Sequence, residues 1–257
     1  MSSTTPDGVL YRLVDTASGQ VLVAAEDIRG FFVDPEDPEA PGEQERPTVT
    51  FLRVHSSGPA RRRTEDAGLE VVGRDGSAVG EYVIGRASSV LPDLSSGAGE
   101  RPGVDWDFLG HTCEYPDAGR IWPLWAEGGP AGPGEWARRP ARTHGSWLHV
   151  VQTAWFTSGR RATRYGTTET AVLDGSALTT EESFYCALGE AVNGPGGYFG
   201  SNLDALHDCL RSLRRNSDRP LRVRWHDLAA SRAALGDACT DALLSVFAES
   251  GVDVTGD

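Results

Sequence analysis

Two aspartates, Asp204 and Asp208, follow a glycine-rich stretch at 194–200, and their type and spacing could do chemistry. A spacing of four residues places both carboxylates on one face of a helix. Another face of that helix is predicted to be buried, because leucines recur there at i, i+3, i+7 and i+10: Leu203, Leu206, Leu210 and Leu213. The sequence therefore predicts two carboxylates held toward solvent on a rigid helix, where they can bind a basic group of another molecule.

The start of this helix is predicted from its capping residues. Ser201 or Asn202 can act as the N-cap, and Asp204 then lies in the first turn, where the helix dipole favours negative charge. The alternative is that both aspartates are ordinary solvated residues of a helix N-terminus. His207 paired with Asp204 could act as a general base, but no nucleophile or oxyanion donor accompanies the pair. The sequence therefore predicts no catalytic residues and no enzyme.

The residues from Tyr198 to Leu210 read Tyr-Phe-Gly-Ser-Asn-Leu-Asp-Ala-Leu-His-Asp-Cys-Leu. This ungapped run resembles the signature of the barstar family, the intracellular protein inhibitors of barnase-type ribonucleases. The resemblance covers about residues 168–255, a third of the chain. It implies three parallel strands with helices packed against them, and a protein that blocks the active site of a ribonuclease.

The resemblance also implies which residues bind the ribonuclease. By position, Asp208 fills the phosphate-binding site of the enzyme, and Asp204 is its companion on the same helix face. A carboxylate suits this role because it accepts charge-assisted hydrogen bonds from the basic side chains that bind phosphate. The expected ribonuclease-binding residues are Tyr198, Gly200, Asn202, Asp204, His207, Asp208, Arg211 and Glu249.

Three positions depart from the family pattern. A family tryptophan is His207 here, a threonine is Arg211, and a second tryptophan is Leu213. An arginine facing a basic cleft would repel it, unless the arginine pairs with Asp204 or Asp208 or meets an acidic group on a different nuclease. The expected partner is therefore a small ribonuclease with a basic cleft, barnase-like or a related guanyl-specific enzyme, and the departures favour one other than barnase.

The rest of residues 166–257 predicts an α/β domain. Short strands are expected at 170–175, 220–225 and 252–254, with helices between them. The expected cap residues are Thr179 with Glu182 as a capping box, Asp227 and Asp237 at two later helix starts, and Gly251 at the last helix end. Strands separated by helices pair in parallel through right-handed crossovers, so a small layered α/β domain is predicted.

Residues 1–165 predict a β-rich domain of unrecognised fold. Apolar alternation predicts strands at 9–15, 21–25, 48–55, 69–73, 78–85 and 146–155. The segment 34–47 is rich in proline and acidic residues and is predicted to be an exposed loop. The core of this domain is expected to contain five tryptophans: Trp106, Trp122, Trp125, Trp136 and Trp147. No function is predicted for this part.

Composition limits the class of partner. The chain has 257 residues and a formal charge of −13, and its 24 basic residues are all arginine. An acidic surface argues against nucleic-acid binding, because phosphate backbones require a basic surface, and it suits a basic protein instead. The N-terminus has no signal-peptide pattern, and no apolar run approaches the roughly 20 residues of a membrane span. The protein is therefore expected in the cytoplasm and not at a membrane.

The cysteines predict neither a metal site nor a cofactor. Cys113, Cys186, Cys209 and Cys239 show no paired CxxC spacing. In a reducing compartment they are expected to be free, buried thiols. His111 and Cys113 are a conceivable pair of metal ligands, but no second pair lies near them in the sequence.

Two functions of different classes remain. The first is a ribonuclease inhibitor or immunity-type protein, with the β-rich domain at 1–165 and the barstar-like domain at 166–257. The second is a regulatory or scaffold protein whose barstar-like domain binds a different basic protein. A third alternative, an enzyme in the N-terminal part, lacks a catalytic constellation. The oligomeric state is not predicted.

Overall fold

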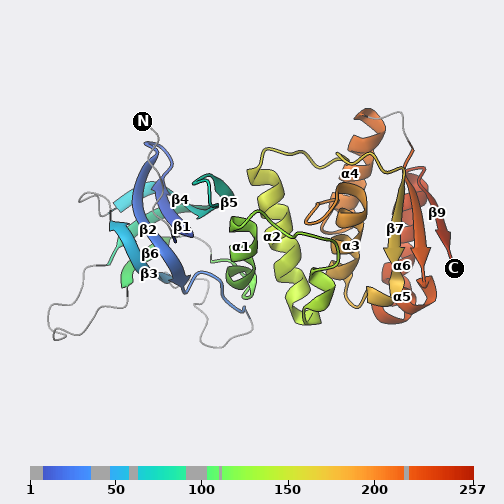
Figure 1. The fold of residues 1–257 in the computed structure, drawn as a ribbon, viewed down its shortest axis with the longest axis horizontal. Coiled ribbons are helices and arrows are strands. Elements are labelled where there is room, and N and C mark those ends of the chain that lie inside the picture. The colour runs from blue at the N-terminus through green and yellow to red at the C-terminus, as the bar shows by residue number, and fades with distance from the viewer. Residues whose placement is uncertain (1–7, 36–46, 58–62, 91–102, 110–111, 217–219) are drawn as a thin grey trace. The chain divides into compact units, whose positions relative to one another are not determined.

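The computed structural model describes residues 8–35, 47–57, 63–90, 103–109, 112–216 and 220–257 (Figure 1). The chain divides into two compact units, Met1–Gly128 and Gly129–Asp257. The boundary near 165 that the sequence suggested for the barstar-like domain falls inside the second unit. Residues 129–165 therefore pack with the C-terminal elements, and each unit is described separately below.

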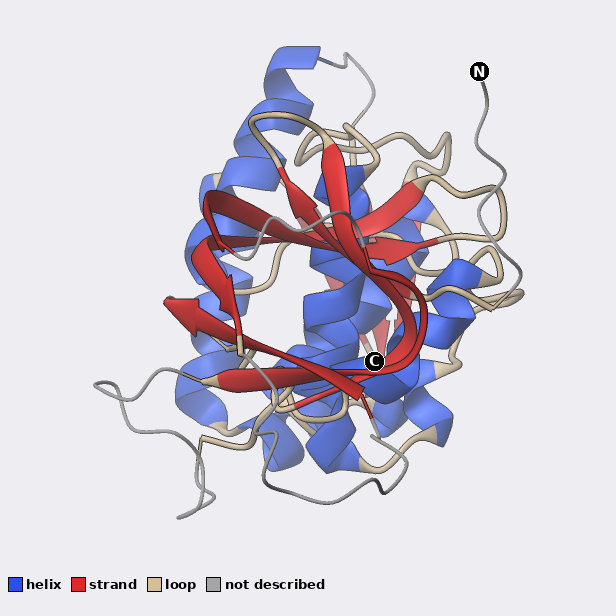
Figure 2. Cartoon of the chain, turned by 90° about the vertical axis from the view of Figure 1, so that its left-hand side faces the viewer, coloured by secondary structure: helices blue, strands red, loops and turns tan. Residues whose placement is uncertain are grey.

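The described part of the first unit is a closed antiparallel barrel of six strands. Figure 2 shows these strands curving around a common centre. The order around the barrel is β1-β2-β3-β6-β5-β4, and β4 pairs with β1 to close it. The strands are β1 (Tyr11–Asp15), β2 (Gln20–Arg29), β3 (Thr48–Ser57), β4 (Arg63–Val72), β5 (Ala78–Ser89) and β6 (Gly103–Leu109). The strands predicted at 9–15, 21–25, 69–73 and 78–85 are confirmed, and they pair as the hairpins β1–β2 and β4–β5.

The barrel interior is filled by alternate residues of its strands, as period-two patterning requires. Leu13, Phe51, Leu69, Val71 and Phe108 are completely buried. Helix α1 (Ala118–Ala126) packs against the barrel through Trp122, whose indole N–H donates to the Tyr82 hydroxyl at 2.8 Å. Gly80 makes this contact possible, because a Cβ there would overlap the Trp122 ring.

The strand predicted at 146–155 is wrong, because these residues belong to helix α2 (His144–Thr157). Buried residues lie on several sides of this helix: Trp147, Leu148, Val150, Val151 and Trp155. A helix that is apolar nearly all round has no polar face to show a 3.6-residue period, so its sequence also fits a buried strand. The β-rich prediction therefore holds as far as β6 and fails beyond it.

The five tryptophans are all buried, but they do not form one β-rich core. Trp106 lies on β6, whereas Trp122 and Trp125 lie on α1. In the second unit, Trp136 lies on the 3-10 helix η1 (Trp136–Arg138), and Trp147 lies on α2 beyond η2 (Ala141–Thr143). The prediction that these tryptophans are buried is confirmed, but four of the five lie on helices and not on strands.

In the described part of the second unit, three parallel strands form a sheet of order β7-β8-β9, as predicted. Helices connect them in the expected sequence (Figure 1). The elements are β7 (Thr170–Asp174), η3 (Gly175–Ala177), α3 (Glu181–Asn193), α4 (Leu203–Asn216), β8 (Arg222–His226), α5 (Leu228–Leu235), α6 (Asp237–Glu249) and β9 (Asp253–Gly256). On β8, Val223 and Trp225 face the core, whereas Arg222 and Arg224 are exposed.

The helix ends differ from the predicted caps in detail. The capping box of α3 is formed by Thr180, which has an extended backbone, and Ser183, one residue later than predicted. Gly236, and not Asp237, precedes α6, and Asp227 precedes α5 without a side-chain cap. Gly251 has a φ of 69° just after α6, which confirms its predicted place at the helix end. The acidic loop predicted at 34–47 lies mostly outside the described residues.

Candidate functional site

The glycine-rich loop before α4 is shaped by contacts inside the domain. Gly194 ends α3 with a φ of 83°, and its N–H donates to the Glu190 carbonyl at 2.8 Å. Gly200 has a φ of 104°, and a Cβ there would lie 2.9 Å from the backbone nitrogen of Leu206. Only glycine suits this backbone and this close approach. Gly200 is buried, so its observed role is to bring the loop against α4.

Helix α4 begins as the sequence predicted. The side-chain oxygen of Asn202 accepts a hydrogen bond from the Ala205 N–H at 2.8 Å, so Asn202 serves as the cap and Asp204 lies in the first turn. The apolar face is buried at Leu206, Cys209, Leu210 and Leu213, and Leu203 is half-buried. The helix is therefore fixed at its start and along its inner side.

The outer face of α4 carries four exposed polar residues, Asp204, His207, Asp208 and Arg211. Arg211 donates to Asp208 at 2.7 Å, with the two side chains 56% and 59% exposed. Among the described residues, Asp204 has no ion-pair partner. An exposed pair of this kind contributes about 0–1 kcal/mol, so a competing cation on another molecule can replace Arg211. Of the two intrahelical partners considered for Arg211, Asp204 and Asp208, the structure shows the pair with Asp208.

Tyr198 is not part of the exposed surface. Its side chain is only 3% exposed, and its ring lies against Trp155 and Phe156 of α2, with centroid distances of 6.5 and 5.3 Å. Its hydroxyl lies 3.4 Å from the Ser201 hydroxyl, and burial raises the pKa of Tyr198 above its ordinary value. In this structure α2, which the sequence had assigned to a strand, therefore covers the side chain of Tyr198, a residue expected to contact a partner.

Asn193, at the end of α3, ties the segment after α2 to the same loop. Its amide N–H groups donate to the carbonyls of Tyr198 at 2.8 Å and Thr163 at 3.1 Å. Its side-chain oxygen accepts from the backbone N–H of Tyr165 at 2.7 Å and of Gly166 at 3.3 Å. All the hydrogen-bonding capacity of this amide is used to hold the two segments together. Sequence reasoning missed this residue because an isolated asparagine at a helix end carries no distinctive pattern.

A half-buried carboxylate, that of Glu190, joins residues 129–138 to α3 in a similar way. Glu190 accepts hydrogen bonds from the Gly134 N–H at 2.7 Å and from the Trp136 indole at 3.1 Å. Burial raises the pKa of Glu190 above its ordinary value.

Glu249, the last expected contact residue, is exposed at the end of α6, which packs against α4.

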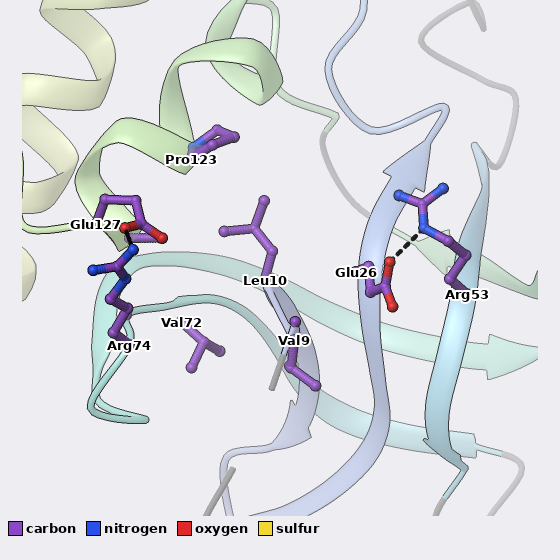
Figure 3. Close-up of a pocket in the computed structure, with 11 residues that line it drawn as sticks. Val9, Leu10, Glu26, Arg53, Val72, Arg74, Pro123 and Glu127 are labelled. Atoms are coloured by element: carbon purple, nitrogen blue, oxygen red, sulfur yellow. Dashed lines mark hydrogen bonds and ion pairs between the residues drawn. The ribbon is translucent and has the colours of Figure 1, made fainter. Parts of the chain in front are cut away.

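The N-terminal unit has a separate pocket of about 430 Å³ (Figure 3). Its lining includes Val9, Leu10 and Val72, with an ion pair between Arg53 and Glu26 at 2.6 Å and another between Arg74 and Glu127. Arg53 has a φ of 49°, a left-handed conformation that side chains rarely adopt. The Arg53 guanidinium and then His55 hold the pKa of Glu26 below its ordinary value. The pocket residues include no nucleophile and neutralise one another.

Within the described ranges, no three or more histidine, cysteine or acidic side chains gather as ion ligands. Cys113, Cys186 and Cys209 are buried free thiols, and Cys239 is half-buried. His111 lies outside the described residues. None of the described helices has the length and apolar character needed to cross a membrane.

Comparison with known families identifies the C-terminal part. The family model described as Barstar (barnase inhibitor) matches residues 168–255. This part of the chain therefore contains a barstar domain, and the resemblance noted in the sequence is confirmed. Among curated proteins, no significant match to the chain is found. Residues 129–167 pack with the barstar domain in one compact unit but precede the family match.

Proposed function

We propose that this chain is a ribonuclease inhibitor of the immunity type, whose barstar domain at 168–255 blocks the active site of a small, secreted, guanyl-preferring ribonuclease. One observation carries the proposal: Asp204 and Asp208 are exposed on a capped, firmly packed helix within the matched domain. The protein would then act without catalysis, and in the cytoplasm, where an active ribonuclease would cut cellular RNA.

The chemistry is occupation of the phosphate-binding site by a carboxylate. Arginine, lysine and histidine side chains that bind a substrate phosphate can donate charge-assisted hydrogen bonds to Asp208 in its place. Because α4 is fixed by its Asn202 cap and its buried leucines, little side-chain and backbone freedom is lost on binding. Opposite charge also raises the rate of encounter, an effect best known from barnase and barstar themselves.

Arg211 sets a condition on the partner. In the free protein it neutralises Asp208 across one helical turn. On binding, the basic cleft must displace Arg211, and the freed guanidinium then needs an acidic or polar group on the nuclease. This requirement favours a nuclease with an acidic group beside its cleft, related to barnase but distinct from it.

The test is inhibition of RNA cleavage by the full chain. Barnase and the barnase-type ribonucleases of the same organism are titrated with wild-type protein and with Asp208→Ala. We expect inhibition by the wild type and binding at least about 30-fold weaker for Asp208→Ala, since truncating one partner of a buried, hydrogen-bonded charge pair has large effects.

The matched control is Asp253→Ala, which removes an exposed carboxylate from β9 of the same domain. This variant should inhibit like the wild type, because β9 lies outside the proposed surface. If the wild type leaves every tested nuclease active, the proposal is wrong.

A second candidate function is a regulatory or scaffold protein that binds a different basic protein. The observations that favour it are the burial of Tyr198 and the Arg211–Asp208 pair, since both alter the surface expected of an inhibitor. Affinity capture with wild type and Asp208→Ala discriminates between the two. A partner without ribonuclease activity that is lost with Asp208→Ala supports the scaffold function.

A further inference from the structure

The segment that precedes the matched domain is held against the glycine-rich loop. Asn193 holds the carbonyl of Thr163 and the N–H of Tyr165 beside the carbonyl of Tyr198. Trp155 further braces this segment, with its indole N–H donating to the Arg161 carbonyl at 2.9 Å. These contacts hold residues 155–166 and the loop together as a single surface.

This segment replaces Tyr198 as the source of exposed aromatic side chains. Tyr198 is buried, whereas Phe156 is 44% and Tyr165 53% exposed. Phe156 meets the Tyr198 ring edge to face at 5.3 Å, and Tyr165 meets Trp155 in the same way at 5.5 Å. Rings held by such neighbours lose little freedom on binding, which is one reason why aromatic residues dominate the energetics of interfaces.

The aromatic pair is linked to the start of α4 by a chain of contacts. From Phe156 the path leads through Tyr198 to Ser201, whose hydroxyl is 3.4 Å from that of Tyr198, and Ser201 directly precedes the cap residue Asn202. Burial is the main cause that raises the pKa of Tyr198, and the charge of Asp208 adds to it. The exposed rings and the carboxylates of α4 are therefore connected through the same loop.

We infer that Phe156 and Tyr165 contact the same ribonuclease that α4 binds, with Phe156 taking the place of the covered Tyr198. This inference rests on the proposed function. It commits to one occupant, a ribonuclease whose basic cleft is bordered by an apolar patch.

Two arginines beside these rings add a requirement on the surface of the nuclease. Arg160 stacks over Trp155 at 4.7 Å, and both Arg160 and Arg161 are exposed. A uniformly basic nuclease surface would be repelled here, whereas α4 requires a basic one. The nuclease must therefore present basic groups to α4 and neutral or acidic groups to residues 156–165, which is the same condition that Arg211 imposes.

The test measures the affinity of the full chain for a catalytically inactive form of the ribonuclease that it inhibits. Phe156→Ala should weaken binding about tenfold or more, as expected for an aromatic anchor. Val172→Ala is the control, because Val172 is a similarly exposed apolar residue, 52% exposed, on β7. It should change the affinity less than about twofold.

A second measurement does not depend on the folding of a variant. Hydrogen exchange of the wild-type chain should slow across residues 155–166 as well as across α4 when the ribonuclease is added. Unchanged exchange at 155–166, or equal affinities for wild type and Phe156→Ala, overturns the inference. If Asp208→Ala still weakens binding in that case, the proposed function stands. If no ribonuclease binds at all, both are wrong.

Discussion

The barrel and the α/β unit use their surface charges in different ways. On the barrel, carboxylates pair with arginines of other strands: Glu70 with Arg12 at 2.7 Å, Glu26 with Arg53 at 2.6 Å and Glu65 with Arg86 at 2.6 Å. On α4, Asp204 has no ion pair within the described part of the chain, and Asp208 pairs only with Arg211 of its own helix. These three barrel carboxylates are engaged across strands, whereas Asp204 and Asp208 on α4 stay available to another molecule.

The two units also differ in where their charged side chains lie. The barrel has a pocket lined by two ion pairs (Figure 3), and the α/β unit has exposed carboxylates on the outer face of α4. Carboxylates on an exposed helix face can bind a basic group of another protein, whereas those of the pocket are already paired with arginines. The difference teaches that an acidic composition alone does not locate a binding surface, because each carboxylate must be judged by the element that carries it and by its partners.

The largest effects on stability are expected from two glycine-to-alanine substitutions, one in each unit. A Cβ at Gly189 would overlap the carbonyl oxygen of Gly197, and a Cβ at Gly80 would overlap the Trp122 ring. We expect each alanine variant to lose about 2–3 kcal/mol of stability in its own unit. Thermal unfolding and ribonuclease binding are measured together, and only Gly189→Ala should weaken binding. Weakened binding by Gly80→Ala would show that the barrel contributes to the site.

A smaller effect is expected from pH. Burial lowers the pKa of His149 on α2 to about 4, so the unfolded chain binds more protons between about pH 6.5 and 4. The stability from this group is full above pH 6.5 and falls by about 2 kcal/mol at pH 5. In the barrel, the pKa values of Glu26 and Glu65 are lowered. The stability that these carboxylates contribute is therefore lost only at a pH below the ordinary pKa of a glutamate, where acid protonates them in the folded barrel.

The measurement is unfolding of the full chain at pH 7 and pH 5, with His149→Gln as the variant that does not titrate. The raised pKa of Glu190 acts in the opposite direction, since the stability it contributes is lost as pH rises, and it is the same in both proteins. The α/β unit should therefore lose less stability on acidification in His149→Gln than in the wild type. Equal losses would assign the acid sensitivity to other groups.

The smallest expected effect lies in the barrel. Arg53→Asn relieves a left-handed conformation that asparagine tolerates better, and it removes exposed ion pairs with Glu26 and Asp27. Because the two contributions oppose each other, we expect a net change within about 1 kcal/mol. Arg53→Gln removes the same ion pairs but keeps a residue that tolerates this conformation poorly, so the difference between the two variants measures the backbone strain. A loss above about 2 kcal/mol for Arg53→Asn would contradict this explanation.

The α4 region could be predicted from the sequence because its signals are local. The leucine spacing, the Asn202 cap and the family run all lie within one short segment, and the i, i+3 spacing made the Arg211–Asp208 pair possible. The parallel sheet was likewise predictable from period-two alternation at Val223 and Trp225.

The covering of Tyr198 could not be predicted, because its cause is distant in sequence. It depends on α2, whose apolar residues on several sides resemble those of a buried strand, and on Asn193, three of whose four hydrogen bonds reach residues 27 to 30 positions away. The link between Glu190 and Trp136 depends on a segment broken by glycine and proline, where no periodicity exists to read. Local patterns predict a helix and its faces, but they do not show which other segment packs on it.

The hydrogen bonds of Asn193 have a practical consequence for truncation of the protein. A fragment that begins at 168, where the family match begins, would lose Trp155, Phe156 and the backbone groups of Thr163, Tyr165 and Gly166 that Asn193 binds. Tyr198 would then become a new apolar surface, and we expect such a fragment to self-associate. A fragment that begins at Gly129 keeps the whole compact unit, so it is the smallest piece expected to stay monodisperse during purification.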